Sequence, residues 1–275
     1  MNKQRVFFAI AGFALAPASI PAGHAETPAP ACSGMLAVID RPTAADSGCV
    51  VPQGMIDTEA GATVGNLYGP PSGGFYSLPD LTVRLGLPGN SELVWLPPQF
   101  QHQSIDSAPG APRATLRGFG ATTLGAKHEL GYSEHWQWTA EALATLPSGD
   151  NTFGSHGPGG AVNAILGYGD GTLGVSLMVG VSSQTEPTAA GGRRFQTFNP
   201  DLVMTYGATS RLQLYGEIYA QSHSGYLQGW GVNADGGLQY LVTPALVVDL
   251  EEGVRIQGSL GGFSNYTGLG FGLMF

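Results

Sequence analysis

The chain is poor in charged residues and has no excess of positive charge. Lys, Arg, Asp and Glu make up 11% of its 275 residues, and 20 acidic residues stand against 11 basic ones. Nucleic-acid binding needs a basic face, so this balance argues against a nucleic-acid partner. The sequence also lacks the ligand spacings of metal sites and the glycine loops of nucleotide sites. We therefore expect no metal, no other cofactor and no catalytic residues.

Long apolar runs are missing as well. After residue 25 no stretch of about 18 apolar residues occurs, which excludes a helical membrane protein. The first residues carry a different signal, with Lys3 and Arg5 before a short apolar stretch and Gly23-His24-Ala25 at its end. This pattern predicts a signal peptide over residues 1–25 that is cleaved on export. Its removal leaves 9 basic and 20 acidic residues, a net charge of −11.

Cysteine is scarce, since the chain has only Cys32 and Cys49. A CxxC redox pair or a zinc site would need closer spacing or more ligands. In an exported protein we expect the two cysteines to pair, which contributes about 3 kcal/mol through chain entropy. The disulfide would close a small loop within residues 26–51, which we expect to form a periplasmic N-terminal segment ahead of the first strand.

Regular alternation of apolar and polar residues begins at residue 52. Segments of about ten residues alternate in hydrophobicity and are separated by turn residues, which is typical of transmembrane β-strands. This pattern predicts an all-β fold, an antiparallel up-and-down barrel of about twelve strands over residues 52–275. The expected strands are 54–66, 75–87, 91–103, 115–130, 135–147, 159–168, 172–184, 196–208, 211–222, 226–242, 245–257 and 264–275.

The connections between these segments differ in length in a regular order. Alternate connections are short, at 88–90, 131–134, 169–171, 209–210 and 243–244, whereas three of those between them are long, at 104–114, 148–158 and 185–195. Short turns at one end and long loops at the other are the pattern of an outer-membrane barrel. A soluble secreted β-protein, the rival fold, has no reason to keep that order.

The last strand supports the same interpretation. Phe271, Leu273 and Phe275 fall on one face of an extended strand, and the chain stops on an aromatic residue. A soluble protein would rarely leave such a strand as an open edge, whereas a barrel closes it against the first strand. The terminal aromatic also resembles the signal by which bacterial outer-membrane barrels are recognised for insertion.

The opposite strand faces collect charged residues, which we expect to face the lumen. Nine are acidic and four basic, and such groups must be solvated or paired inside a barrel. Either a salt-bridge network fills the barrel, or a wet path with an acidic bias favours cations and neutral solutes over anions. The candidates are Glu59, Asp80, Arg84, Arg117, Lys127, Glu129, Glu141, Asp201, Glu217, Asp235, Asp249, Glu251 and Arg255.

Four segments resemble a known family. They are Gly54–Glu59, Leu81–Leu93, Gly118–Lys127 and Ala142–Asp150, and the chain departs from the family pattern at Ala121, where an acidic residue is usual. These segments are similar to the outer-membrane barrels named for the meta-pathway of phenol degradation. The resemblance implies a transport barrel, with passive passage of small molecules that include hydrophobic or aromatic compounds. It carries no catalytic residues to transfer.

Two other functions remain open at this point. A closed barrel could serve a structural or surface-interaction role through its long loops. A lipid-modifying enzyme could use His102 and Ser104, whose spacing places both side chains on one strand face. For the transport barrel, the expected partners are outer-membrane lipid, the barrel-insertion machinery and a small-molecule solute. The expected location is the outer membrane of a Gram-negative bacterium.

Overall fold

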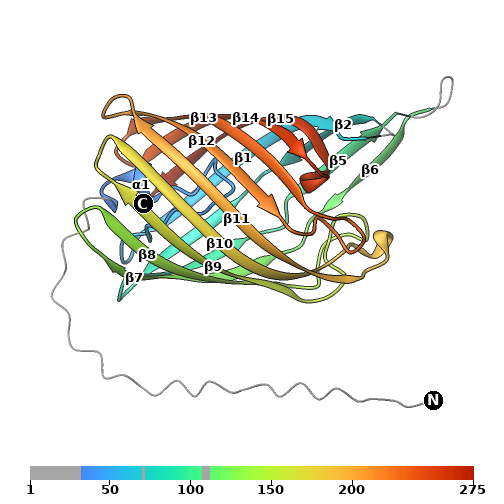
Figure 1. Cartoon of the computed structure of the whole chain (residues 1–275), viewed down its shortest axis with the longest axis horizontal. Coiled ribbons are helices and arrows are strands. Elements are labelled where there is room, and N and C mark those ends of the chain that lie inside the picture. The colour runs from blue at the N-terminus through green and yellow to red at the C-terminus, as the bar shows by residue number, and fades with distance from the viewer. Residues whose placement is uncertain (1–31, 70–71, 107–111) are drawn as a thin grey trace, which may run out of the picture.

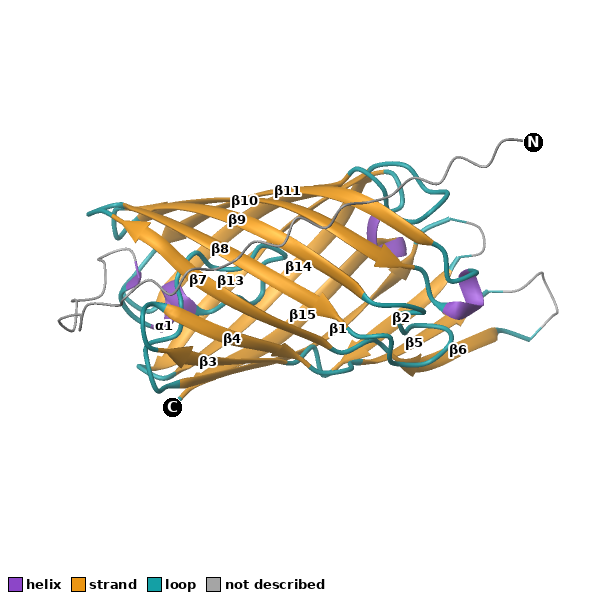
Figure 2. Cartoon of the chain, turned by 90° about the horizontal axis from the view of Figure 1, so that it is seen from below, coloured by secondary structure: helices purple, strands orange, loops and turns teal. Residues whose placement is uncertain are grey.

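The computed structural model describes residues 32–69, 72–106 and 112–275, and the predicted signal peptide lies outside them. Its strands form one antiparallel sheet that closes on itself, because β1 pairs with β15 over eleven residue pairs from Asp57↔Met274 to Leu67↔Phe263. Figures 1 and 2 show the resulting barrel, with strands steeply tilted to its long axis. The strands are β1 (Ile56–Leu67), β2 (Gly73–Leu78), β3 (Thr82–Leu87), β4 (Ser91–Leu96), β5 (Phe100–Ile105), β6 (Ala114–Phe119), β7 (Thr123–Tyr132), β8 (Trp136–Thr145), β9 (Gly159–Gly169), β10 (Leu173–Thr185), β11 (Arg194–Gly207), β12 (Leu212–Gln221), β13 (Gly231–Thr243), β14 (Leu246–Gln257) and β15 (Phe263–Met274).

Three of the barrel strands are each broken once. β2 and β3, β4 and β5, and β6 and β7 are consecutive halves of single strands, so the closed barrel has the twelve strands that the sequence predicts. Proline explains two of the breaks, because it cannot donate to the ladder. Pro79 separates β2 from β3, and Pro97-Pro98 lie between β4 and β5. The third break, at 120–122, begins with Gly120.

The connections follow the predicted order. The turns at 88–90, 133–135, 170–172, 208–211 and 244–245 lie at one end, which we call the short-turn end. Gly89 and Asn90 both have positive φ, 75° and 51°, as the tightest hairpin turns require. The opposite, long-loop end carries 146–158 and 222–230 among others. Two short 3₁₀ helices lie at this end, over Thr188–Ala190 and Leu260–Gly262.

The distribution of polarity is the reverse of that in a soluble protein. The outer wall is apolar, and side chains such as Val181 and Leu269 are 58% and 60% exposed. The inner wall is charged, and Arg84 and Lys127 are completely buried. An apolar outside and a polar inside are what a barrel in a bilayer requires. Aromatic side chains that include Trp136, Trp138 and Phe275 are exposed near the short-turn end, where an interfacial girdle is expected.

The N-terminal segment lies inside the barrel rather than ahead of it. Its helix α1 (Met35–Val38) and the chain up to residue 55 enter the lumen at the short-turn end (Figures 1 and 2). Met35, Val38 and Ile39 pack against inward-facing Val247 and Met274. This differs from the expected separate periplasmic segment. The physical reason is that the segment is too short to bury these apolar side chains with Cys49 and Val51 alone, and the barrel wall completes their cover. None of the helices in the described part of the chain is long and apolar enough to cross a bilayer.

Candidate functional site: a plugged lumen

Residues 32–55, which we call the plug, fill the short-turn half of the lumen. A disulfide joins Cys32 to Cys49 across α1, with 5.4 Å between the Cα atoms, and confirms the predicted pairing. The loop it closes carries most of the contacts with the wall. The disulfide therefore fixes the shape of the segment that occupies the lumen.

Wall carboxylates bind the backbone of the plug. Glu59 accepts hydrogen bonds from the N–H groups of Asp40 and Arg41, at 2.9 and 2.6 Å. Glu217 on β12, four strands away from β1 around the barrel, accepts those of Ala44 and Ala45 at 2.9 and 2.8 Å. Hydrogen bonds to charged groups contribute about 1.5–3 kcal/mol each, roughly twice a neutral pair. The plug is thus held through its main chain at several points around the wall.

Two buried cations join the carboxylates of plug and wall. Arg84 lies 2.8 Å from Asp57 and from Glu59, and 3.2 and 3.4 Å from Asp40 and Glu92. Lys127 completes the network, at 3.1 Å from Asp40 and 3.2 Å from Glu92. Because Asp40 belongs to the plug and the other carboxylates to the wall, the network ties the two together. A buried charge network is retained only where nearly every member is paired, as here.

Arg41 extends from the plug toward β14. Its guanidinium is 3.0 Å from Asp249 and 3.9 Å from Glu251. Burial alone would lower the pKa of Arg41, but the hydrogen bond to Asp249 and the charges of Glu251 and Asp80 raise it above its ordinary value. The guanidinium therefore stays charged and neutralises part of the acidic wall.

Asp46 is the titratable group of the plug with the most unusual environment. Burial against the wall raises the pKa of Asp46 well above its ordinary value, and the neighbouring carboxyls of Glu141 and Asp40 add to the effect. Lys127 acts in the opposite direction but does not compensate. Docking of the plug consequently favours the protonated form of Asp46.

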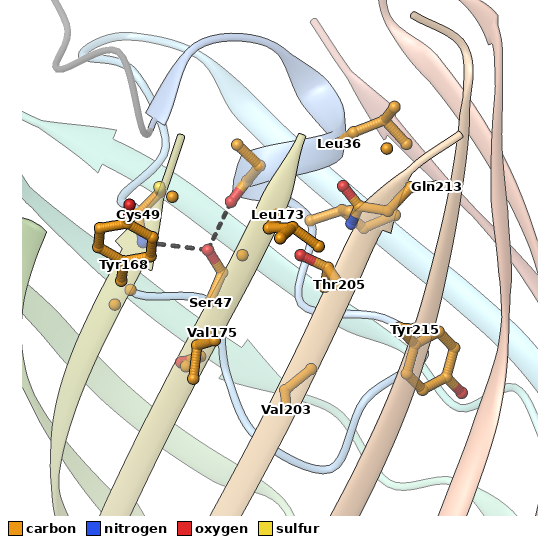
Figure 3. A pocket seen from close by; sticks show the side chains of 18 of the residues that line it. Leu36, Ser47, Cys49, Tyr168, Leu173, Val175, Val203, Thr205, Gln213 and Tyr215 are labelled. Atoms are coloured by element: carbon orange, nitrogen blue, oxygen red, sulfur yellow. Dashed lines mark hydrogen bonds between the residues drawn. The ribbon is translucent and has the colours of Figure 1, made fainter. Parts of the chain in front are cut away.

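Between the plug and strands β9 to β13 a cavity of about 300 Å³ remains, near the short-turn end (Figure 3). Leu36, Ser47 and Cys49 line it from the plug, and Thr205 and Gln213 line it from the wall. Its inner end meets an apolar cluster in which plug residue Ala45 packs with wall side chains. The cluster consists of Ala45, Ile165, Met178, Val203 and Tyr215, all buried. The plug and this cluster together occupy the part of the lumen beside the cavity.

Most of the predicted lumen residues lie on the inner wall. Nine of them have 8% or less of their surface exposed, namely Glu59, Arg84, Lys127, Glu141, Asp201, Glu217, Asp235, Asp249 and Glu251. Asp80 lies in the break between β2 and β3 and accepts hydrogen bonds from Thr63 and Ser77 at 2.8 and 2.9 Å. Glu129 is half-buried beside the 88–90 turn, where its N–H donates to Asn90 O. Arg255 lies near the long-loop end, with its guanidinium 3.7 Å from the centre of the Tyr68 ring.

Arg117 departs from the expectation. Arg117 lies opposite His102 in the neighbouring strand, and His102 lies opposite Tyr76 in the next one. The side chains of His102 and Tyr76 line a groove on the outer wall. In an unbroken strand Arg117 would share a face with Lys127, ten residues later. The break at 120–122 shifts the alternation by one position, and Arg117 is therefore exposed outside the lumen.

The charged network also includes residues that the sequence reasoning missed. Asp57 and Glu92 are completely buried on the wall, and Asp40 and Arg41 come from the plug. Asp57 could have been found from its spacing of two from Glu59, which places both on one strand face. Asp40 and Arg41 precede the alternating region, and no local pattern places them in a lumen.

His102 and Ser104 lie together on the outer wall, in a groove of about 430 Å³ that also contains Val64, Asn66 and Tyr76. The His102 ring stacks on Tyr76 at 4.7 Å between centres. Within the described ranges no hydrogen bond joins His102 to Ser104 or to a carboxylate. A nucleophile activated by a base needs such contacts. The two residues are brought together, but without the third group that would orient the histidine.

The closed wall, apolar outside and polar inside, defines the class of outer-membrane β-barrels. Within that class the chain belongs to the family described as "Putative MetA-pathway of phenol degradation", whose profile matches residues 39–265. This confirms the family inferred from the sequence, and the match includes most of the plug. No curated protein sequence matches the chain at a significant level.

Solved structures of similar fold include two porins. The chain is similar to the NanC porin in its rhombohedral crystal form, with a TM-score of 0.50, 14% identity and coverage of 79% of this chain and 98% of the porin. It is also similar to the KdgM porin in complex with disordered oligogalacturonate, with a TM-score of 0.50, 10% identity and coverage of 80% and 99%. At these identities the likeness concerns the fold alone.

Proposed function

We propose that this protein is a passive transport barrel of the outer membrane whose lumen is gated by its own N-terminal plug. The observation that carries the proposal is the chemistry of the contact between plug and wall. The wall offers carboxylates, and the plug occupies them with backbone N–H groups and with Arg41. Water can replace these polar contacts, so displacement of the plug costs chiefly the apolar contacts of Met35, Val38 and Ile39 with Val247 and Met274. Displacement of the plug would therefore leave a solvated polar channel inside an intact barrel.

The proposed solutes are small molecules without negative charge. The inner wall is rich in carboxylates, which repel anions, and the cavity beside the plug is lined by hydroxyl, amide and apolar groups. Hydrophobic or aromatic compounds fit this lining, and the family description points in the same direction. We place the short-turn end and the plug at the periplasmic side, in a Gram-negative outer membrane reached after cleavage of residues 1–25. The barrel would contact outer-membrane lipid, and Phe271, Leu273 and Phe275 would direct it to the insertion machinery.

The deciding experiment compares the mature protein with a variant that lacks residues 26–51, both refolded in detergent and inserted into planar bilayers. Heat-modifiable migration establishes that each barrel is folded. We expect frequent, larger conductance steps for the truncated barrel and rare or small ones for the mature protein. A folded, truncated barrel that stays silent would refute the transport proposal and favour a closed barrel that acts through its surface loops. A lipid hydrolase activity lost in His102→Ala or Ser104→Ala would favour the enzyme instead.

A further inference from the structure

Three carboxylates on the inner wall have no cationic partner among the residues that the structure describes. Asp201 on β11, Glu217 on β12 and Asp235 on β13 lie side by side, and we call them the acidic cluster. Glu217 and Asp235 are directly paired residues of neighbouring strands. The three are 5%, 5% and 8% exposed. Arg41 binds the neighbouring Asp249 and Glu251, but no Lys, Arg or His side chain of the described ranges forms an ion pair with the cluster.

The carboxyl groups of the cluster also contact one another. Asp201 and Asp235 each come within hydrogen-bonding range of Glu217, whose oxygens already accept the N–H groups of Ala44 and Ala45. Buried carboxylates in contact cannot all be ionised unless a cation compensates their charge. The arrangement therefore requires either shared protons or a positively charged ligand.

Unpartnered polar atoms point to a ligand. Oδ1 of Asp201, Oδ1 of Asp235 and the hydroxyl of Tyr215 are buried, and among the residues that the structure describes no hydrogen-bond donor outside the cluster reaches them. Tyr215 is 8% exposed, and its hydroxyl interacts electrostatically with Asp235, Glu251 and Glu217, so it is directed into the same acidic region. Unsatisfied buried polar atoms call for an explanation, and three of them gathered beside one another in the same acidic region point to a ligand.

Tyrosine rings border the cluster. The Tyr266 hydroxyl donates to Asp235 at 2.8 Å, and its ring lies across Gly253, where an added Cβ would come within 2.1 Å of a ring carbon. Tyr215 packs in the same way against Gly237, 2.9 Å from the position of an added Cβ. Tyr215 also packs in the apolar cluster with Ala45 and Val203, and the Tyr266 ring contacts that of Phe263 at 4.8 Å between centres, so both rings are held in place beside the carboxylates. Aromatic faces beside carboxylates attract ammonium groups through cation–π and charge interactions.

We propose that the acidic cluster, with Tyr215 and Tyr266, forms a binding site for a small organic ammonium ion inside the lumen. An organic cation suits the site better than a metal ion, because the described residues contain no set of three or more His, Cys, Asp or Glu side chains placed to hold a metal. The site deepens the proposed transport function, and it rests on that function only for the route by which the ligand enters.

The test uses the refolded mature barrel in detergent, with tetramethylammonium as the probe and isothermal titration calorimetry as the measurement. We expect saturable binding at one site, weakened at least about tenfold in Asp201→Asn/Asp235→Asn, because the carboxylates that compensate the cation are neutralised. Glu252→Gln is the matched control, since Glu252 lies on the outer wall and its loss should leave binding unchanged. If the double variant does not fold, the single variants Asp201→Asn and Tyr215→Phe take its place.

Three results would overturn the site. They are the absence of saturable binding, binding that persists in the folded double variant, and displacement by sodium at equal concentration, which would indicate a site for inorganic cations. The result of this binding experiment can be distinguished from the result of the conductance experiment. A silent barrel that binds tetramethylammonium keeps the site and loses transport, whereas a conducting barrel that does not bind it keeps transport and loses the site.

Discussion

At the scale of single residues, the plug depends on the pairing of main-chain donors with wall carboxylates. Glu59 and Glu217 each bind two consecutive N–H groups of the plug, from strands that lie four apart around the barrel. Such pairs fix the path of the plug without demanding particular plug side chains. Asp46 differs, because its environment opposes the charge that it carries in water.

Asp46 should make plug docking dependent on pH. Its pKa in the docked plug lies well above the value of about 4 for a free aspartate, so the docked state binds the proton more tightly. Its contribution to docking is fully present below about pH 4 and is lost as the pH rises through the raised pKa. We expect Asp46→Asn to keep the plug docked more firmly at pH 7 and to flatten the dependence of channel opening on pH. A difference of one pKa unit corresponds to about a tenfold change in the ratio of docked to released plug.

The measurement is the open fraction in planar bilayers between pH 4 and pH 8. Asp106→Asn, at an exposed loop aspartate that pairs with Arg113, is the control and should match the unmodified barrel. Identical pH profiles for Asp46→Asn and the unmodified protein would show that Asp46 does not control docking.

At the scale of elements, glycines on the inner face of β15 form the seat of the plug. An added Cβ at Gly270 would lie 2.4 Å from Arg41 Nε and 2.7 Å from Ala60 O. At Gly272 it would lie 2.5 Å from Ile39 Cδ1 and 3.0 Å from Met35 Cε. The alternation of glycine with outward Leu269 and Phe271 therefore serves two surfaces, one facing the membrane and one facing the plug.

Filling this seat should loosen the plug while the barrel wall stays folded. We expect Gly270→Ala to push the Arg41 guanidinium away from Asp249 and to raise channel opening severalfold, since the added Cβ would lie where Nε and Cζ of Arg41 now sit. Gly216→Ala on β12 is the matched control, because nothing lies within 4 Å of its added Cβ. Opening and protease sensitivity of residues 32–55 are the measurements. Equal behaviour of the two variants would count against the seat.

The elements themselves were largely predictable. All twelve expected strands occur, because side-chain alternation with period two is imposed by a membrane on one face and a polar lumen on the other. The three breaks were not foreseen, although Pro79 and Pro97-Pro98 stand within the expected strands. The break at 120–122 shifts the alternation of inward and outward side chains, which is why Arg117 lies outside the barrel while Lys127 lies inside.

At the scale of the whole molecule, the sequence could not reveal the plug. Barrel strands can be predicted from the local alternation of apolar and polar residues. The contacts of Asp40 and Arg41, in contrast, join residues far apart in the chain, as in the pair Arg41–Asp249. The clues were indirect. A short, disulfide-closed segment carried the apolar residues Met35, Val38 and Ile39, and β15 carried glycines that face the interior of the barrel.

The charge of the whole lumen leads to a final prediction about the open barrel. Without the plug, Arg41 is gone and the inner wall retains a clear excess of carboxylates over Arg84 and Lys127. We expect the barrel that lacks residues 26–51 to select cations, with reversal potentials measured across a salt gradient. Adding Asp249→Asn and Glu251→Gln should lower the cation-to-anion permeability ratio by about two- to fivefold, because lumen charge concentrates counter-ions. Asp106→Asn with Glu134→Gln makes the same change of charge at exposed positions and should have little effect. If the lumen and surface pairs changed selectivity equally, the acidic inner wall would not be what the permeating ions meet.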